Sequence, residues 1–364
     1  MPQRDAAQDA ALAAAADCRE RGDWRGALAL LTQVNRQQPR AALQQQMVDW
    51  RIQAGRTAVT PLPEKRAFNQ AEQAEQAEQA NEAGPAAVAA ELPGTIPEIP
   101  AQALTAERLH QAIHSHGALI VRGLLDRPAA AGLAQQIDRV VAAREDPDAF
   151  PPVEPDAAWY VRSAEAWGKP SQFFRRLGQG EQSSSIWVAD SPRVACELLA
   201  LYEALGLPAL LQAYFGEPAR LSVKKWVLRK MAPKKDGDAG WHQDGRFLGE
   251  DISTVNLWLA LSDCGGDAAA PGMDLLADGR REIHPTGTDG AWFDWTVGPE
   301  RVARLAADIG ITQPRFAPGD ALLFDHYSLH RTALEDHHTA VRYAIESWFF
   351  AASSAPAQQQ PLFF

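Results

Sequence analysis

The chain is poor in cysteine and has no long apolar run. Its 364 residues contain only three cysteines, Cys18, Cys196 and Cys264, which are far apart in the sequence. An odd and scattered set of this kind argues against a disulfide framework and a zinc-cysteine site, and it favours a reduced, cytoplasmic protein. No stretch reaches the roughly 20 consecutive apolar residues that a transmembrane helix needs, so we expect no membrane-spanning segment.

The chain also lacks an excess of basic residues. It has 35 Lys and Arg against 46 Asp and Glu, which gives a formal net charge of −11. General binding to nucleic acid or to an anionic membrane needs the opposite balance, so we expect neither partner. One local basic cluster stands out, formed by Lys224, Lys225, Arg229, Lys230, Lys234 and Lys235. We favour a solvated face for it, because most charge runs are solvated, and leave open an anionic or carrier-bound substrate.

Residues 1–58 have the apolar spacing of helices around the turn Arg21-Gly22-Asp23. The run from Ala11 to Pro39 resembles one tetratricopeptide repeat, and we predict a helical hairpin for this segment. A single repeat buries no continuous core, so the hairpin must pack on the following helix, on the main domain or on a protein partner. A plain helical hairpin without a binding role is an equally weighted alternative.

The rest of the chain divides into a linker, a main domain and a tail. Residues 59–103 are rich in proline and repeat the triplet Ala-Glu-Gln, which is typical of a low-complexity linker. The main domain is assigned to residues 104–352 and the tail to residues 353–364. Within the domain, residues 145–192 form a long irregular insert rich in aromatics, either a lid over an active site or a loop pinned by buried rings.

The main domain begins with helices and continues with many short strands. Helices are predicted over 129–144 and 192–215, the second interrupted at Gly206-Leu207-Pro208. Strands are predicted at 117–123, 221–231, 254–261, 281–285, 315–316, 321–327 and 340–350. This order favours a mainly β fold, a barrel or double-sheet jelly roll with flanking helices, plus the small N-terminal helical segment.

The candidate site is the motif Trp241-His242-Gln243-Asp244-Gly245. His242 and Asp244 are two residues apart, and on an extended strand such residues project from the same face. A third ligand from a neighbouring strand, for which His330 is our candidate, would give two imidazoles and one carboxylate with the opposite metal positions open. His326 would share a strand face with His330 and is its rival on geometry alone.

Several ordered motifs resemble the phytanoyl-CoA dioxygenase family of Fe(II)- and 2-oxoglutarate-dependent oxygenases. The resemblance covers about residues 104–350 and rests on Gly-Ala-Leu-Ile-Val-Arg-Gly-Leu-Leu at 117–125, Trp-His-Gln-Asp at 241–244, Pro-Gly-Asp-Ala-Leu-Leu-Phe at 318–324, His-Arg-Thr at 330–332 and Arg342. It implies a double-stranded β-helix, which is a cupin-like relative of the jelly roll. The implied reaction is hydroxylation of a C–H bond of a small molecule, with release of succinate and CO2.

The resemblance also implies roles for single residues. His242, Asp244 and His330 would bind Fe(II), and Arg342 would hold the distal carboxylate of 2-oxoglutarate, since a planar guanidinium donates two parallel hydrogen bonds. Trp258 would line the cosubstrate pocket, although a core tryptophan explains it equally well. Gln243 and Thr332 would orient ligands or cosubstrate. Many family members carry a Pro-Gly-Ser-His loop where this chain has 270–275, so the resemblance does not extend to the substrate.

Two other functions fit parts of the same pattern. One is a non-catalytic protein in which the N-terminal hairpin binds a partner and the dioxygenase-like domain is a scaffold. The other is a zinc hydrolase, because two histidines and a carboxylate bind zinc as well as iron. The intact set of His242, Asp244, His330 and Arg342 argues against the scaffold, and Arg342 argues against the hydrolase.

Overall fold

The computed structural model describes residues 6–57, 94–146, 159–161, 184–233 and 240–364. Its helices are α1 (Ala6–Glu20), α2 (Trp24–Gln37), α3 (Ala41–Thr57), α5 (Ala106–His116), α6 (Arg127–Glu145), α9 (Pro192–Ala204), α10 (Leu207–Phe215), α11 (Gly245–Leu248) and α12 (Pro299–Ile309). Its strands are β1 (Glu98–Pro100), β2 (Ala118–Arg122), β3 (Ser184–Trp187), β4 (Ala219–Met231), β5 (Thr254–Ala260), β6 (Met273–Leu275), β7 (Ala321–Phe324), β8 (His330–Thr332), β9 (Arg342–Ala351) and β10 (Pro361–Phe363).

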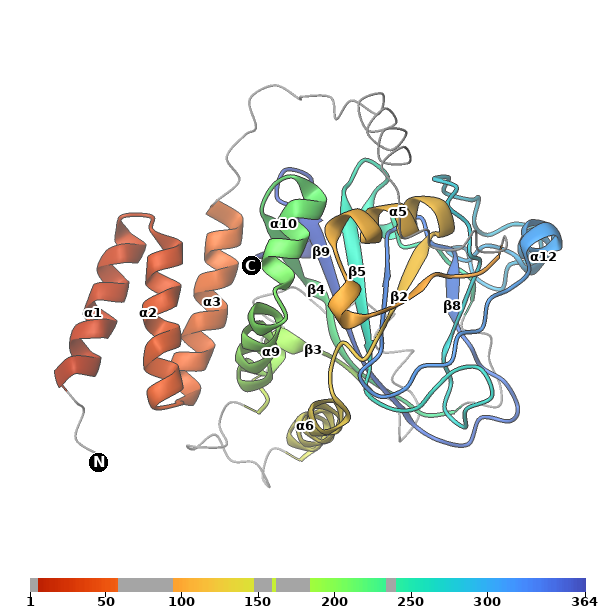
Figure 1. Ribbon diagram of the computed structural model, residues 1–364. Coiled ribbons are helices and arrows are strands. Elements are labelled where there is room, and N and C mark those ends of the chain that lie inside the picture. Colours follow the sequence, from red (N-terminus) through yellow and green to blue (C-terminus); the bar gives the residue numbers. More distant parts are fainter. Residues whose placement is uncertain (1–5, 58–93, 147–158, 162–183, 234–239) are drawn as a thin grey trace.

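Eight strands form one mixed sheet, and two more form a small second sheet. The large sheet has the order β1-β2-β7-β5-β9-β4-β10, with β3 also pairing with β4, and the small sheet pairs β6 with β8. Among the described strands, β1 and β2 run parallel, and the other pairs are antiparallel. Helices flank this arrangement (Figure 1). The predicted fold, a mainly β jelly roll with flanking helices and an N-terminal helical segment, is confirmed.

The central strands β5 and β9 are buried on both faces, because helices cover one face and the second sheet covers the other. Alternate residues therefore enter two different cores. Leu257 and Phe349 belong to the core beneath the helices, whereas Trp258 and Trp348 belong to the core between the sheets. We call the face that carries Trp258 and Trp348 the inner face. Every functional side chain described below on β4, β5 or β9 lies on it.

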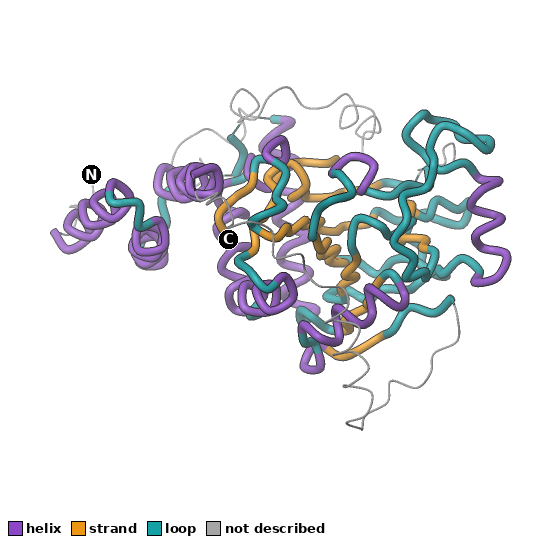
Figure 2. Tube along the Cα trace, turned by 90° about the horizontal axis from the view of Figure 1, so that it is seen from above, coloured by secondary structure: helices purple, strands orange, loops and turns teal. Residues whose placement is uncertain are grey.

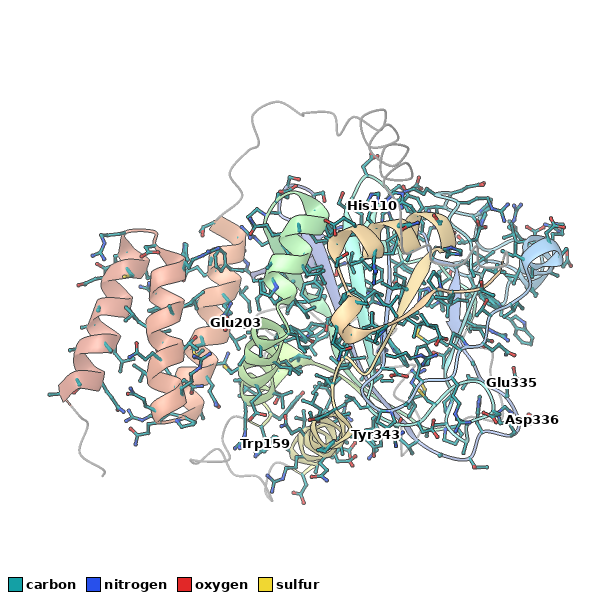
Figure 3. The ribbon with its side chains drawn as sticks, viewed as in Figure 1. His110, Trp159, Glu203, Glu335, Asp336 and Tyr343 are labelled. Carbon is teal, nitrogen blue, oxygen red and sulfur yellow. The ribbon has the colours of Figure 1, made fainter. Side chains whose placement is uncertain are left out.

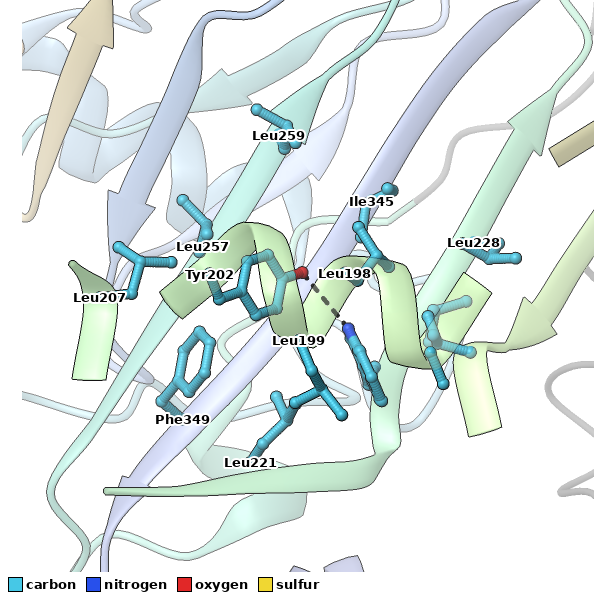
Figure 4. Packing of buried hydrophobic residues seen from close by; sticks show 14 of the residues in the cluster. Leu198, Leu199, Tyr202, Leu207, Leu221, Leu228, Leu257, Leu259, Ile345 and Phe349 are labelled. Atoms are coloured by element: carbon cyan, nitrogen blue, oxygen red, sulfur yellow. Dashed lines mark hydrogen bonds between the residues drawn. The ribbon is translucent and has the colours of Figure 1, made fainter. Parts of the chain in front are cut away.

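The core beneath the helices contains one buried hydrogen-bond network, centred on the Tyr202 hydroxyl (Figure 4). The Tyr202 hydroxyl on α9 lies 2.7 Å from the Ser347 hydroxyl on β9 and accepts a hydrogen bond of 3.3 Å from the Trp226 indole on β4. All three side chains are buried, so these bonds orient α9 on the sheet. The predicted interruption is present, because α9 ends at Ala204 and α10 begins after Gly206, which has φ of 71°.

The N-terminal segment forms three helices, α1 to α3, that stand side by side at one end of the molecule (Figures 1 and 2). Two of them were expected as a hairpin, and α3 joins that hairpin to the main domain. Arg51 on α3 donates a hydrogen bond to the Phe363 carbonyl on β10. It also lies 3.7 Å from Glu203 on α9, which faces α3 in Figure 3. Of the predicted packing options, the structure uses the following helix and the main domain.

Several local expectations differ from the structure. Residues 281–285 form no strand, and Phe316 makes only an isolated bridge with Cys264. The end of the segment assigned as a linker forms β1, and the segment assigned as a tail forms β10. Most of the aromatic insert lies outside the described residues, so the lid stays a prediction.

All three cysteines are free thiols, and burial raises the pKa of Cys196 and of Cys264 to about 12. Among the described residues, no single helix is both long and apolar enough to cross a membrane. The pair α9 and α10 has the required length and composition, but it bends by 69° at its break.

Candidate metal centre

The backbone brings the His-x-Asp segment against the start of β8. His242 and His330 exchange two backbone hydrogen bonds, from His242 N–H to the His330 carbonyl at 2.9 Å and in reverse at 3.0 Å. Such a reciprocal pair places two residues of neighbouring strands directly opposite each other. Gly245 N–H then bonds to the His326 carbonyl, and the chain turns into α11 immediately after Asp244. Two segments almost ninety positions apart in the sequence are thus locked in register.

This register gathers the three predicted ligands. One candidate ligand atom from each of His242, Asp244 and His330 lies within 4.8 Å of the others. The two imidazole centroids are 4.3 Å apart, and His330 Nε2 lies 3.8 Å from Asp244 Oδ2. Asp244 and His330 are buried, and His242 is half-buried. The three donors therefore face one point, as a single metal ion requires.

Both imidazoles are fixed in the tautomer that a metal ligand needs. His242 Nδ1 lies 3.0 Å from the Gly240 carbonyl, and His330 Nδ1 lies 3.0 Å from the Ser328 carbonyl. A carbonyl oxygen only accepts hydrogen bonds, so each Nδ1 carries the proton and each Nε2 keeps a free lone pair. Hydrogen bonds of this kind also fix the ring orientation of metal-bound histidines.

The charge states at neutral pH suit a divalent metal. Burial, reinforced by the neighbouring His330, lowers the pKa of His242 to about 4, and burial also lowers the pKa of His330. Burial would raise the pKa of Asp244, but the positive Lys225 and the two imidazoles outweigh it and hold that pKa well below its usual range. Two neutral imidazoles and one carboxylate with open positions are the donor set of non-haem Fe(II) oxygenases, so these residues fit iron.

Arg342, at the start of β9, is buried without an acidic partner in the described part of the chain. Its side chain is 3% exposed, its Nη1 donates to the Gly272 carbonyl at 3.0 Å, and its Nε has no hydrogen-bond partner. Burial lowers the pKa of Arg342 to about 10. A buried guanidinium that lacks a carboxylate is costly, so this one is suited to an anion that arrives from outside.

Comparison with known proteins identifies the family. Residues 113–334 match the phytanoyl-CoA dioxygenase (PhyH) family. The chain belongs to this family. A comparison with curated proteins gives no match.

Solved structures with a similar fold include those of EctD and SnoN. EctD from S. alaskensis in its apoform is 17% identical, with 69% of this chain and 78% of that chain covered and a TM-score of 0.47. The epimerase SnoN from nogalamycin biosynthesis, in complex with Fe3+, α-ketoglutarate and nogalamycin RO, is also 17% identical. That match covers 68% of this chain and 83% of that chain, with a TM-score of 0.45. Both likenesses concern the fold alone.

The other predicted site residues of this PhyH-family chain take different positions. Trp258 is buried on the inner face of β5, and the Arg342 guanidinium lies 5.6 Å from its ring centroid. Thr332 lies two residues after His330 on β8 and pairs with Met273, next to the Gly272 carbonyl that accepts from Arg342. Trp258 therefore lies beside the Arg342 guanidinium, and Thr332 lies beside the backbone that accepts a hydrogen bond from it.

The side-chain amide of Gln243 forms hydrogen bonds with the backbone of neighbouring loops. Its Nε2 donates to the carbonyls of Glu282 and Tyr327, at 2.7 and 2.6 Å, and its Oε1 accepts from His284 N–H at 2.7 Å. These three bonds tie the metal-binding segment to two neighbouring loops. Of its two predicted functions, the contacts favour orienting the ligands over contacting the cosubstrate.

The predicted rival, His326, does not join the metal cluster. Its Nε2 lies 3.1 Å from the Glu250 carbonyl, and the group of candidate metal ligands in the described residues contains His330 and not His326. The reason is that β7 ends at Phe324, so the alternation of side chains that put residues 326 and 330 on one face does not continue to His326.

Part of the basic cluster lies at this site, which the sequence did not predict. Lys225 Nζ donates to Asp244 Oδ1 at 2.6 Å, Arg229 pairs with Glu346, and Lys230 pairs with Asp138 at 2.7 Å. Lys225 and Arg229 are thus compensated on the inner face, which differs from the solvated face that we favoured. The Lys230–Asp138 pair lies near the surface, where the Asp138 side chain is 48% exposed. Lys234 and Lys235 lie outside the described residues.

Aromatic rings line the approach to His242, and sequence reasoning did not find them either. The Trp295 ring lies 5.7 Å from that of His242 and stacks on Phe293 at 5.6 Å, and Phe247 lies 6.0 Å from Trp295. Phe247 and Phe293 are each 43% exposed, and Trp292 is 80% exposed. Exposed rings gathered beside a metal site form an apolar surface that a substrate can cover.

Proposed function

We propose that this chain is an Fe(II)/2-oxoglutarate-dependent dioxygenase that hydroxylates a C–H bond of a small molecule and releases succinate and CO2. The observation that carries the proposal is the buried Arg342 without an acidic partner in the described part of the chain. The three metal ligands alone suit a zinc hydrolase equally well. A hydrolase has no use for a buried guanidinium that lacks an acidic partner, whereas an enzyme that binds a cosubstrate with a distal carboxylate does.

His242, Asp244 and His330 would hold the metal. With both Nδ1 protons bound by carbonyls, the two imidazoles cannot rotate away, and three protein ligands would leave room for the cosubstrate. Bound iron and 2-oxoglutarate supply the oxidising power of the reaction, and the protein supplies orientation and exclusion of water. The carboxylate of Asp244 favours hydroxylation over halogenation, because related halogenases have a small residue at this position.

Arg342 orients the cosubstrate, and Trp258 and Thr332 form the walls of its pocket. The guanidinium donates to the distal carboxylate, and its bond to the Gly272 carbonyl holds the fork in place. Gly272 also accepts from Ala333 N–H at 3.1 Å, so the same peptide ties Arg342 to the strand that carries His330. This shared contact couples the position of the cosubstrate to that of a metal ligand.

The substrate binds on the side of Phe247, Phe293 and Trp295. These rings favour an apolar portion of the substrate near His242, because covering exposed aromatic surface is favourable in water. Lys225 and Arg229 are already paired with acidic side chains, and they offer little to an anionic group.

The test is an anaerobic titration of the purified full-length protein with Fe(II) and then 2-oxoglutarate. The chelate gives a weak visible charge-transfer band, which we expect in the wild type. His242→Ala should lose it through loss of metal, and Arg342→Met should weaken it through loss of cosubstrate. Succinate formation then serves to screen substrates. A folded wild-type protein that binds Fe(II) and shows no band on addition of 2-oxoglutarate would overturn the proposal.

A further inference from the structure

Lys225 reaches the metal site because of an irregularity in β4. The pairing of β4 with β9 shifts register between Leu221 and Trp226. Before the shift, Leu221 and Val223 enter the core beneath the helices. After it, Arg229 contacts Glu346, and Lys225 Nζ lies 5.9 Å from the Trp348 ring centroid on the inner face. A bulge of this kind redirects a side chain to the opposite face of a sheet.

The Lys225 ammonium is held between two carboxylates. Its Nζ is 2.6 Å from Asp244 Oδ1 and 3.8 Å from Glu346 Oε1. Glu346 is fixed in turn by Arg229 and by a hydrogen bond of 3.0 Å from the Trp348 indole. The side chain of Lys225 is 21% exposed, and those of Asp244 and Glu346 are 3% and 10% exposed. A charge-assisted bond with this degree of burial is stronger and more directional than one on the surface.

The two oxygens of Asp244 have different partners. Oδ1 accepts from Lys225, whereas Oδ2 lies 3.8 Å from His330 Nε2 and faces the point shared by the metal ligands. With Oδ1 engaged by the ammonium, only Oδ2 is directed at a metal. The position of Lys225 is thus distinct from that of the metal, because each occupies a different oxygen of the same carboxylate.

We propose that Lys225 is a positioning residue that keeps Asp244 a one-oxygen ligand, an inference that rests on the proposed function. Two imidazoles, one carboxylate oxygen and a chelating 2-oxoglutarate leave a single position of an octahedral metal for dioxygen. A second oxygen from Asp244 would fill that position. By holding Oδ1, Lys225 keeps the position free, and Arg229 and Glu346 keep Lys225 in place.

The experiment measures Fe(II) affinity anaerobically in the full-length chain without 2-oxoglutarate, and then the EPR signal that nitric oxide gives at a free Fe(II) position when 2-oxoglutarate is bound. The variants are Lys225→Met and Lys225→Arg, with Lys224→Met as a matched control on the neighbouring residue. We expect Lys225→Met to raise Fe(II) affinity several-fold, because Asp244 can then bind through both oxygens and no ammonium lies beside the metal. At saturating iron it should also reduce the nitric oxide signal.

Lys225→Arg restores a donor and a positive charge, so it should recover both properties to within a few-fold, and Lys224→Met should match the wild type. Folding is checked by circular dichroism. Glu346→Gln removes the second anchor of Lys225 and gives an independent variant, with smaller changes in the same directions as Lys225→Met. Lys225→Met and Glu346→Gln proteins that are folded and match the wild type in iron affinity and nitric oxide signal would overturn the inference. A wild type that binds Fe(II) but forms no chelate band refutes the proposed function alone.

Discussion

Replacing Arg342 by methionine should remove cosubstrate binding without destabilising the protein. Burial lowers the pKa of Arg342 to about 10. Relative to the ordinary arginine pKa, this corresponds to a penalty on the order of 3 kcal/mol for the charged form in the folded protein. Methionine fills a similar volume and carries no charge. The variant loses the bond to the Gly272 carbonyl, about 1 kcal/mol, so the net change lies between zero and a gain of about 2 kcal/mol.

The same substitution should weaken 2-oxoglutarate binding strongly. Two charge-assisted hydrogen bonds to a carboxylate contribute about 1.5–3 kcal/mol each, so their loss raises Kd by roughly 10²- to 10⁴-fold. The assays are urea unfolding of the metal-free protein and 2-oxoglutarate titration of the Fe(II)-loaded protein. Stabilisation of the wild type by added 2-oxoglutarate, absent in the variant, provides a second measure.

Arg229→Met is the matched control. Arg229 also lies on the inner face and is largely buried, but it is paired with Glu346. Breaking a buried pair costs about 3–5 kcal/mol, and we expect the lower end of this range here, because Glu346 keeps the more distant Lys225 and the Trp348 indole as partners. The two arginines should therefore respond with opposite signs in the unfolding assay. If Arg342→Met loses as much stability as Arg229→Met, Arg342 is a structural residue, and the reasoning from its missing partner is refuted.

The remaining predictions concern packing, pH and substrate. Gly55→Ala should destabilise the protein by about 1–3 kcal/mol, because the new methyl group overlaps the Pro361 carbonyl. Gly132→Ala, in the open middle of α6, should stabilise it by up to about 1 kcal/mol, and urea unfolding compares the two. Metal-free protein should lose stability as the pH falls from about 6.5 to 4. In this range the half-buried His242, whose pKa is lowered to about 4, stays neutral while the unfolded chain takes up a proton. Unfolding at several pH values measures the slope, and an equal slope in His242→Ala would contradict this cause. Trp295→Ala should raise KM for the substrate and leave Fe(II) affinity unchanged, which steady-state kinetics and metal titration separate.

Two of the three metal ligands could be predicted because their relative position is set by their spacing in the sequence. His242 and Asp244 share a strand face through a spacing of two, which no tertiary contact needs to create. The choice between His326 and His330 depends on where β7 ends, and the resemblance to the family favoured His330. The same resemblance assigned Trp258 to the cosubstrate pocket and Thr332 to orienting the ligands or the cosubstrate, and these roles stay predictions. The helix predicted over 129–144 lies close to the observed α6 (Arg127–Glu145), which Asp126 caps and which has a proline in its first turn.

Lys225 could not be assigned to the site from the sequence. Counting alternate residues from Leu221 and Val223 puts Lys225 on the face beneath the helices, and only the register shift in β4 reverses this. The strands β3 and β10 were missed for a related reason. They have four and three residues, too few for a periodic pattern, and their pairing with β4 defines them.

The N-terminal helices cover the edge of the large sheet. β10 is the last strand of the sheet path, and an uncovered edge strand exposes backbone groups that can pair with another chain. α3 covers this strand: Arg51 donates to the Phe363 carbonyl, Arg56 donates to the Gln360 side chain, and Gly55 lets the helix approach the Pro361 backbone. α1 and α2 then cover the outer side of α3 through a core of their own. A partner is therefore not required to bury the repeat-like hairpin, because the dioxygenase domain supplies the surface that further repeats would provide.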